Sequence, residues 1–352
     1  MSRSEGHIKT KVRTMEQLSE TIGISRPTLS KFFQDSGSVR SSTRVRIEEA
    51  LSNIDYVPNY FATNMNRQST RTIGIIVPYL NDPFFTTLIQ SIEKSALQNG
   101  YAAVVHSAHG DAALEAKALQ NMVAMCVDGV IAAPIAHSSS RKEIEALRQD
   151  VPIVFIDSRY PDEFDDIDFV GTNNQQSISL IVDYLCRSGP SPVFFGMPRI
   201  NSNSLEREKA YLSSAATLRF EPDVIPLKKT NSVWNFEEFA YNTMDEYFAR
   251  GEYIDSTVLC ANDRLAIGVI RAANKHHLLP QRESTSNFRV AGHDDHPLSA
   301  YVYPALTTVS RNTDDMGQAA VEQILDQIDN GKRDGQGVVR TFNAELRLRE
   351  SA

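Results

Sequence analysis

The chain has 352 residues, which is more than one compact core usually covers and predicts two or three domains. Its 41% hydrophobic and 23% charged residues are typical of globular proteins, and no apolar run approaches the roughly 18 residues that span a membrane. The polar, basic start over residues 1–13 lacks the apolar stretch of a signal peptide, so we expect a cytoplasmic protein.

The net charge of −8 is unevenly distributed along the chain. Residues 1–71 contain 11 Lys and Arg against 7 Asp and Glu, a net charge of +4, so the remainder carries −12. A basic head on an acidic body favours a head that contacts polyanionic DNA, although charge runs are more often solvated surface.

Residues 14–57 have the pattern of three short helices. Thr14 is expected to cap the first helix, Gly23 to supply a tight turn, and Ser25 to cap the second helix. A third apolar periodicity follows over residues 43–54. Three short helices, the first two joined by a glycine-containing turn, indicate a helix-turn-helix unit.

The head ends at Pro58, which restricts Val57 to extended geometry. Asn59 can then cap a short helix over residues 60–66, and the polar residues 67–71 have the composition of a linker. The predicted segments are a basic tail (1–13), the helix-turn-helix domain (14–57), the hinge helix and linker (58–71), and a sensor domain (72–352).

From Thr72 on, uncharged strand patterns alternate with amphipathic helical patterns, which predicts parallel sheets with both faces covered. A second such series begins near Val170, so we expect two doubly wound α/β subdomains. The expected elements include strands over 153–156, 224–226 and 257–260 and helices over 236–249 and 263–275. The first is predicted over 72–169 plus 311–330 and the second over 170–310 plus 331–352. Ligands bind such sheets beyond the carboxyl ends of the strands, so a cleft between the subdomains is the expected site.

Six motifs stand out along the chain: Ile24-Ser25-Arg26-Pro27-Thr28-Leu29-Ser30-Lys31, Tyr56-Val57-Pro58-Asn59, Ile73-Gly74-Ile75-Ile76-Val77-Pro78, Asn81-Asp82-Pro83-Phe84-Phe85, Val127-Asp128-Gly129-Val130-Ile131 and Pro304-Ala305-Leu306-Thr307-Thr308-Val309. With these motifs the sequence resembles the lactose-repressor (LacI) family of bacterial regulators, from about Thr14 to Arg349. The resemblance implies a small all-α head on an α/β body of periplasmic-binding-protein type.

The second helix carries the residues expected to contact DNA. By the resemblance, the base-reading positions are Arg26, Pro27 and Lys31, and Arg and Lys can bond guanine in the major groove. Hydroxyl groups of the same helix are expected to bond phosphates; they belong to Ser25, Thr28 and Ser30. The alternative is that these residues are ordinary solvated surface. The Arg26-Pro27 pair is uncommon in the family, as is Gln17-Leu18 in the first helix, so the operator sequence stays open.

The resemblance also implies a hinge helix that enters the minor groove of DNA. Its expected contacts are Asn59, Ala62 and Met65, with Met65 as the apolar wedge that kinks the duplex. The alternative is that Met65 packs on Phe61 within the helix. A seven-residue helix is unstable alone in water, so we expect it to form only on DNA.

In the sensor, three residues follow the first strand's carboxyl end: Tyr79, Asp82 and Phe85. Aromatic rings stack on sugar or base faces, and a carboxylate accepts bonds from hydroxyls. The resemblance adds four residues from the second subdomain: Arg207, Trp234, Asn262 and Asp294. Trp234 has an alternative as ordinary core, and Asp263 is expected to cap its helix rather than contact a ligand. Arg207 and Asp294 have the alternative of a buried structural pair.

Metal binding and catalysis are not expected. The segment Gly292-His293-Asp294-Asp295-His296 has possible ligands, but no further His or Cys series would complete a metal site. The three cysteines lie in apolar segments and are expected to be free thiols. No phosphate-binding loop, dinucleotide fingerprint or nucleophile elbow occurs, so we expect no cofactor and no enzyme activity.

The expected protein is therefore a dimeric regulator that binds a pseudo-palindromic operator, and its effector is a sugar or sugar derivative by the habit of the family. No leucine-heptad tail of the kind that makes tetramers is visible. Two alternatives share the body's fold: a solute-binding protein and an enzyme on the same scaffold. The identity of the effector, the operator and the sign of regulation stay open.

Overall fold

The computed structural model describes residues 10–57, 69–135, 141–160, 163–227, 234–279, 287–331 and 335–352. The chain folds as two units, 1–71 and 72–352, so the boundary falls at the end of the predicted linker.

Within residues 10–57, three helices enclose a small core. They are α1 (Met15–Ile22), α2 (Arg26–Gln34) and α3 (Ser41–Ser52), with a 3-10 turn, η1 (Ser36–Ser38), after α2. The Thr14 side chain accepts a hydrogen bond from the Gln17 amide at 3.1 Å, and Gly23 ends α1 with a φ of +64°. The core side chains are Val12, Leu18, Ile24, Leu29, Ile47 and Ile54. The predicted cap and the glycine turn are thus confirmed.

A short parallel pair closes this core: β1 (Thr10–Lys11) lies beside β2 (Ile54–Asp55). The sequence pattern placed Ile54 at the end of the third helix, which was wrong. Ile54 reaches the core from β2, and a two-residue strand is too short for its periodicity to be recognised.

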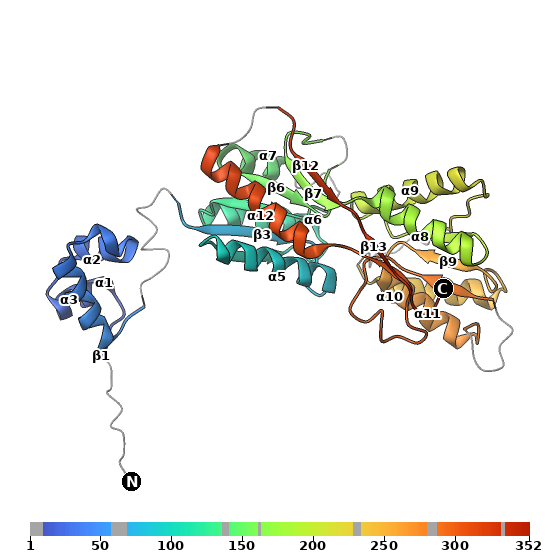
Figure 1. Cartoon of the computed structure of the whole chain (residues 1–352), viewed down its shortest axis with the longest axis horizontal. Coiled ribbons are helices and arrows are strands. Elements are labelled where there is room, and N and C mark those ends of the chain that lie inside the picture. The colour runs from blue at the N-terminus through green and yellow to red at the C-terminus, as the bar shows by residue number, and fades with distance from the viewer. Residues whose placement is uncertain are drawn as a thin grey trace, which may run out of the picture. The chain divides into compact units, whose positions relative to one another are not determined.

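The second unit contains a six-stranded parallel sheet in the order β12-β7-β6-β5-β3-β4. Its strands are β3 (Thr72–Val77), β4 (Ala102–Ser107), β5 (Gly129–Ala132), β6 (Ile153–Ile156), β7 (Asp168–Thr172) and β12 (Val339–Phe342). One face is covered by α5 (Pro83–Gln98) and α12 (Thr313–Asn330), and the other by α6 (Ala112–Ala124) and α7 (Arg141–Asp150) (Figure 1).

A second, three-stranded parallel sheet has the order β10-β9-β8. Its strands are β8 (Pro192–Phe195), β9 (Thr257–Cys260) and β10 (Arg289–Ala291). Its helices are α8 (Asn174–Ser188), α9 (Ser202–Leu218), α10 (Phe236–Ala249) and α11 (Asp263–Lys275). β11 (Thr308–Ser310) pairs antiparallel with β13 (Glu345–Arg347). The prediction of two parallel α/β subdomains is confirmed, and we call them the N-subdomain and the C-subdomain.

The division between the subdomains differs from the boundaries expected at 169/170 and 330/331. β7 pairs with β6, and β12 pairs with β7, so both strands belong to the N-subdomain sheet. The chain therefore crosses between the subdomains three times: after β7, between β11 and α12, and between β12 and β13. A strand expected over 224–226 is reduced to a single bridge between Val224 and Phe194.

Candidate functional sites

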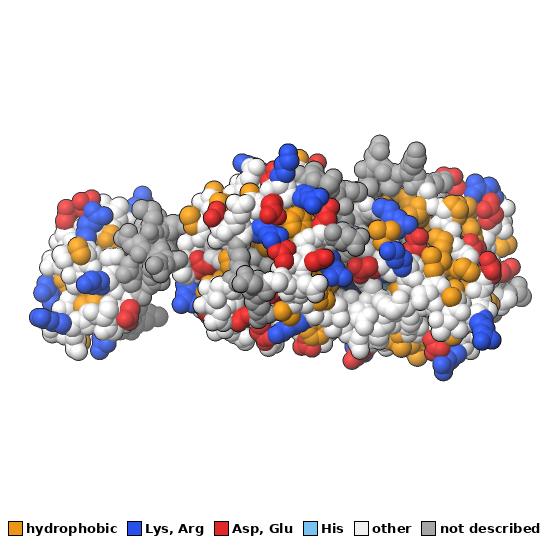
Figure 2. Space-filling view, turned by 90° about the horizontal axis from the view of Figure 1, so that it is seen from above, with side chains coloured by type: hydrophobic (Ala, Val, Ile, Leu, Met, Phe, Trp, Pro, Cys, Tyr) orange, Lys and Arg blue, Asp and Glu red, His pale blue; other side chains and the backbone are white. Residues whose placement is uncertain are grey.

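In the head, α2 presents a polar face to solvent and an apolar face to the core. Leu29 is fully buried, whereas Arg26, Pro27 and Lys31 are exposed. Among the described residues, the one ion pair of Arg26 is long, 3.9 Å to Glu16, and both side chains are mostly exposed. Such a pair contributes little, so the guanidinium is available to a partner. Basic side chains predominate over acidic ones on the face of the head seen in Figure 2.

The residues expected to contact phosphate lie at the start of the same helix. Ser25 is the N-cap by position, but its hydroxyl bonds the Thr28 hydroxyl at 2.9 Å rather than a backbone amide. Thr28 and Ser30 are half-buried. Their contacts with DNA stay a prediction. The predicted hinge residues Asn59, Ala62 and Met65 lie outside the described residues.

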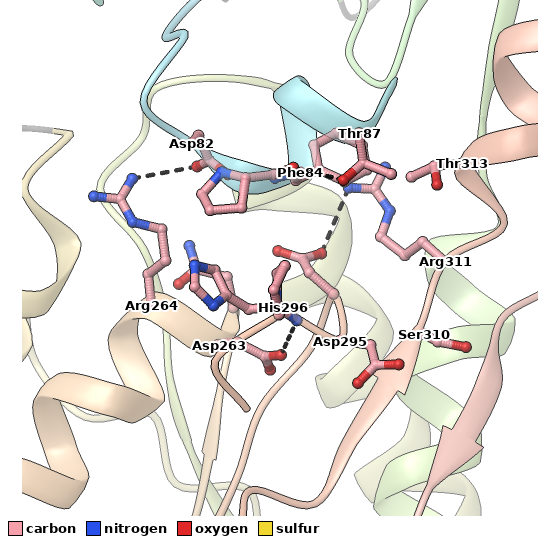
Figure 3. Close-up of a pocket in the computed structure, with 14 residues that line it drawn as sticks. Asp82, Phe84, Thr87, Asp263, Arg264, Asp295, His296, Ser310, Arg311 and Thr313 are labelled. Carbon is pink, nitrogen blue, oxygen red and sulfur yellow. Dashed lines mark hydrogen bonds and ion pairs between the residues drawn. The ribbon is translucent and has the colours of Figure 1, made fainter. Parts of the chain in front are cut away.

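A cavity of about 260 Å³ lies between the two subdomains of the second unit (Figure 3). Its N-subdomain wall is formed by the start of α5 and the residues that lead into α12, and its C-subdomain wall by the start of α11 and the loop after β10. The lining residues are Asp82, Pro83, Phe84, Thr87, Arg311, Thr313, Asn262, Asp263, Arg264, Asp294, Asp295, His296, Pro297 and Ser310. The cavity lies beyond the carboxyl ends of β3, β9 and β10, as expected for such sheets.

A smaller hollow of about 30 Å³ shares several of these lining residues and adds three further predicted ones. Asp82, Asn262 and Asp294 line both spaces, and Phe85, Arg207 and Trp234 line the smaller one. Tyr79 lines neither space. The structure thus brings six of the seven predicted effector residues to these two spaces.

Arg207 and Asp294 form a buried ion pair, with Nη2 donating to Oδ1 at 3.0 Å and Arg207 2% exposed. Arg207 also donates to the Asn174 side chain and to the Ala261 carbonyl. Burial raises the pKa of Asp294, but Arg207 and a hydrogen bond from His293 outweigh it, so the net pKa lies below the usual range. Arg207 therefore belongs to a structural network that also faces the hollow.

Arg311 extends this network into the N-subdomain. It donates to the Asp157 carboxylate, approaches Asp294 Oδ1 at 3.5 Å, and packs its guanidinium on the Phe84 ring at 3.8 Å from the ring centroid. A guanidinium on an aromatic face contributes both stacking and electrostatic attraction. Arg311 and Phe84 were not predicted as site residues, because neither stands at a position that the sequence motifs assign to the effector.

The capping role expected of Asp263 belongs instead to its neighbour. Asn262 is the N-cap of α11, accepting from the Leu265 amide at 2.8 Å. Asp263 is buried and accepts from the Thr308 and Ser299 hydroxyls and from the His296 amide. Burial raises the pKa of Asp263 to about 7, and the charge of Asp294 adds to this effect. Asp263 thus anchors the loop after β10 to the start of α11.

His296 offers a hydrogen-bond donor to the cavity, and the sequence reading had considered it only as a metal ligand. Its Nδ1 accepts from the Leu298 amide at 3.0 Å, which leaves the proton of the neutral ring on Nε2. Burial lowers the pKa of His296, and the charge of Arg264 lowers it further, so the ring is neutral near pH 7. Within the described residues, no group of three or more His, Cys, Asp or Glu is arranged to hold a metal ion.

Known proteins resemble this chain in sequence and in fold. Residues 73–333 match the family model described as periplasmic binding protein domain. The probable HTH-type transcriptional regulator EndR of Paenibacillus polymyxa is 25% identical, over 97% of this chain and 98% of the relative. The chain belongs to the LacI family of periplasmic-binding-protein-like regulators.

Other members agree in length and fold with this LacI-type regulator. The ribose operon repressor of Escherichia coli (strain K12) is 24% identical, over 90% of this chain and 93% of the relative. A crystal structure of the lac repressor dimer, bound to operator and the anti-inducer ONPF, has a TM-score of 0.80 at 21% identity. It covers 96% of this chain and 98% of that one. Among the residues described here, no helix has the length and apolar character needed to span a membrane.

Proposed function

We propose that this LacI-type regulator is a repressor that binds a pseudo-palindromic operator as a homodimer and is controlled by a small-molecule effector in the inter-subdomain cavity. The observation that carries the proposal is the occurrence of both parts on one chain. Leu29 anchors α2 in the core of the head, and Arg26 and Lys31 on the same helix are exposed to solvent. The second unit has a ligand-sized cavity lined by polar groups from both subdomains. A regulator of operator DNA acts where the DNA is, so we place it in the cytoplasm.

The proposed DNA contacts fall into two groups. Arg26 and Lys31 read bases in the major groove, with Pro27 limited to apolar contact. The positioning contacts to phosphate and to the minor groove come from Ser25, Thr28, Ser30, Asn59, Ala62 and Met65. A two-fold dimer presents two copies of α2, which is why the operator is expected to be a pseudo-palindrome.

The proposed effector is a sugar or sugar derivative. Asp294 offers Oδ2, which accepts no hydrogen bond from the described residues, and the amide nitrogen of Asn262 is likewise left for a ligand. Phe84 supplies an aromatic wall, and His296 a neutral donor. Such a mixture of acceptors, donors and one ring suits hydroxyl groups on an apolar face. Similar proteins include a ribose operon repressor, a sucrose operon repressor and a transcriptional regulator solved in complex with cellobiose. We propose no catalytic activity.

Two measurements test the proposal. Selection of random duplexes with the full-length protein should yield a two-fold symmetric site whose affinity falls steeply with salt. A thermal-shift screen of sugars, sugar acids and nucleosides should give a hit, because ligand at 100 times Kd stabilises by roughly 2.7 kcal/mol. A protein that binds ligand but selects no DNA site would instead favour a solute-binding role.

A further inference from the structure

Two of the contacts that join the subdomains beside the cavity involve Arg264 and Trp234. Arg264, on α11 of the C-subdomain, donates from Nη1 to Asp82 Oδ2 at 3.2 Å, and Asp82 stands at the start of α5 in the N-subdomain (Figure 3). Both side chains are mostly buried, at 13% and 12% exposure. Nearby, the Trp234 ring stacks on Tyr79 with centroids 6.1 Å apart and planes 3° from parallel. Both contacts must part if the cleft opens.

Arg264 has a second, independent carboxylate partner in its own subdomain. Its Nε and Nη2 donate to the two carboxylate oxygens of Glu237, each at 2.7 Å, and Nη2 also donates to the Trp234 carbonyl. When Asp82 moves away, Arg264 therefore keeps a bidentate carboxylate partner, and its own charge stays paired. This distinguishes Arg264 from Arg207, whose only carboxylate partner among the described residues is Asp294.

Asp82 also keeps a second hydrogen bond when it separates from Arg264. Its Oδ1 accepts from the Phe84 amide at 3.0 Å and caps α5, so only Oδ2 is used by Arg264. Asp82 also lines the cavity, so Oδ2 freed from Arg264 is an acceptor that a ligand hydroxyl can reach. A ligand and Arg264 thus compete for the same oxygen.

Closing the cleft also has an unfavourable free-energy contribution, which comes from Trp234. This ring is 7% exposed, and its Nε1 has no hydrogen-bond partner in the described structure. It packs against Gly110 of the N-subdomain, where a Cβ atom would lie only 2.3 Å from Nε1. A buried donor without an acceptor disfavours the closed state and regains water when the cleft opens. The ion pair and the ring stack therefore favour the closed cleft, and the unsatisfied Nε1 donor of Trp234 opposes them.

We propose that the ion pair between Arg264 and Asp82 is a latch that holds the ligand-free cleft closed, and that an effector hydroxyl releases it by binding Asp82 Oδ2. The inference rests on the proposed sensing function and names how the same site is regulated. A ligand shifts such an equilibrium only through its different affinities for the two states, and the contested oxygen supplies that difference.

Trp234 is the only tryptophan in the chain, so its fluorescence reports the cleft without a label. We would measure acrylamide quenching of the ligand-free, full-length protein and of Asp82→Asn, which keeps an N-cap side chain but loses the charge. Arg264→Gln removes the other partner. Each variant should raise the quenching constant roughly twofold or more, because the open population grows when the latch is lost.

Two controls are available in the same subdomain. Lys275→Gln breaks an exposed ion pair between α11 and Asp245, 2.8 Å long, and leaves the latch intact. Glu237→Gln removes the second partner of Arg264 but not Asp82. Neither control should raise the quenching constant. A rise in Lys275→Gln would mean that any charge lost from α11 loosens Trp234, which would overturn the latch.

The double variant Asp82→Asn/Arg264→Gln decides between a latch and two unrelated effects. A latch predicts no further quenching beyond either single variant, whereas additive increases refute it. Quenching at the wild-type level in either single variant, with a cooperative melt by circular dichroism, also refutes it. If one variant does not fold, the other single variant and its scattering radius of gyration still decide. Operator binding is measured separately, so its loss would refute the proposed function and leave the latch standing.

Discussion

Removing the Asp294 carboxylate should destabilise the second unit strongly. Asp294 Oδ1 accepts from Arg207 at 3.0 Å and from His293 at 2.9 Å, and Arg207 is 2% exposed. Asp294→Ala would leave Arg207 as a buried charge without a carboxylate, which costs about 3–5 kcal/mol. For a unit of this size, each kcal/mol corresponds to about 2–4 °C in melting temperature, so we expect a loss of about 6–20 °C.

The neighbouring Asp295→Ala is the matched control. Asp295 pairs with Arg349 at 2.7 Å, but both side chains are more than a fifth exposed, at 24% and 21%. Such a pair contributes about 0–1 kcal/mol, so its loss should shift the melt by a few degrees at most. Melts followed by circular dichroism and gel-shift titrations of both variants test the difference. Equal shifts would refute the buried-pair argument. A wild-type melt for Asp294→Ala with a lost effector response would make Asp294 a pure ligand contact.

Three further outcomes are expected. Burial lowers the pKa of His293 from 6.5 to about 4. Between these two pH values the ring is protonated in the unfolded state and neutral in the folded state, so stability falls as the pH falls. This group should therefore remove about 2 kcal/mol of stability between pH 7 and pH 5, and urea titrations of His293→Gln should show a shallower decline, unless the ring is charged in the fold. Arg26→Ala should cost about 1–3 kcal/mol in operator binding and relax preference at one base pair per half-site; uniform weakening in binding to variant operators would assign Arg26 to phosphate. Leu29→Ala should destabilise the head by about 2–5 kcal/mol and abolish operator binding, while calorimetry shows an unchanged melt of the second unit.

Local patterns in the sequence located the elements well. The predicted bounds of α10, α11, β6 and β9 agree with the structure residue for residue. Each is a continuous amphipathic or apolar run, so its identity depends on neighbouring residues alone. The sheet that β7 joins could not be read this way, because pairing is decided by residues far along the chain.

The site was predictable only where a motif marks it. Asp82 stands in such a motif, the family resemblance indicates Asn262 and Asp294, and all three line the cavity. Arg264 and Arg311 were missed, since an arginine in a sequence gives no indication of which carboxylates will surround it. Their roles arise from partners more than 100 residues away, Asp82 for the first and Asp157 for the second.

The three crossings between the subdomains have a consequence for synthesis on the ribosome. α12 and β12, which complete one face and one edge of the N-subdomain sheet, are translated only after most of the C-subdomain, from α8 to β11. Until then, one apolar face of the nascent sheet lacks α12, and β7 is an unpaired edge strand because β12 is missing. Exposed apolar surface and unpaired strand edges are the features that chaperones bind and that lead to aggregation. The C-subdomain is also incomplete until this stage. The backbone and the side chain of Ser351 both form hydrogen bonds with the backbone of Val290 on β10. Both halves of the sensor therefore reach their final fold only when residues 313–351 have been added to the chain.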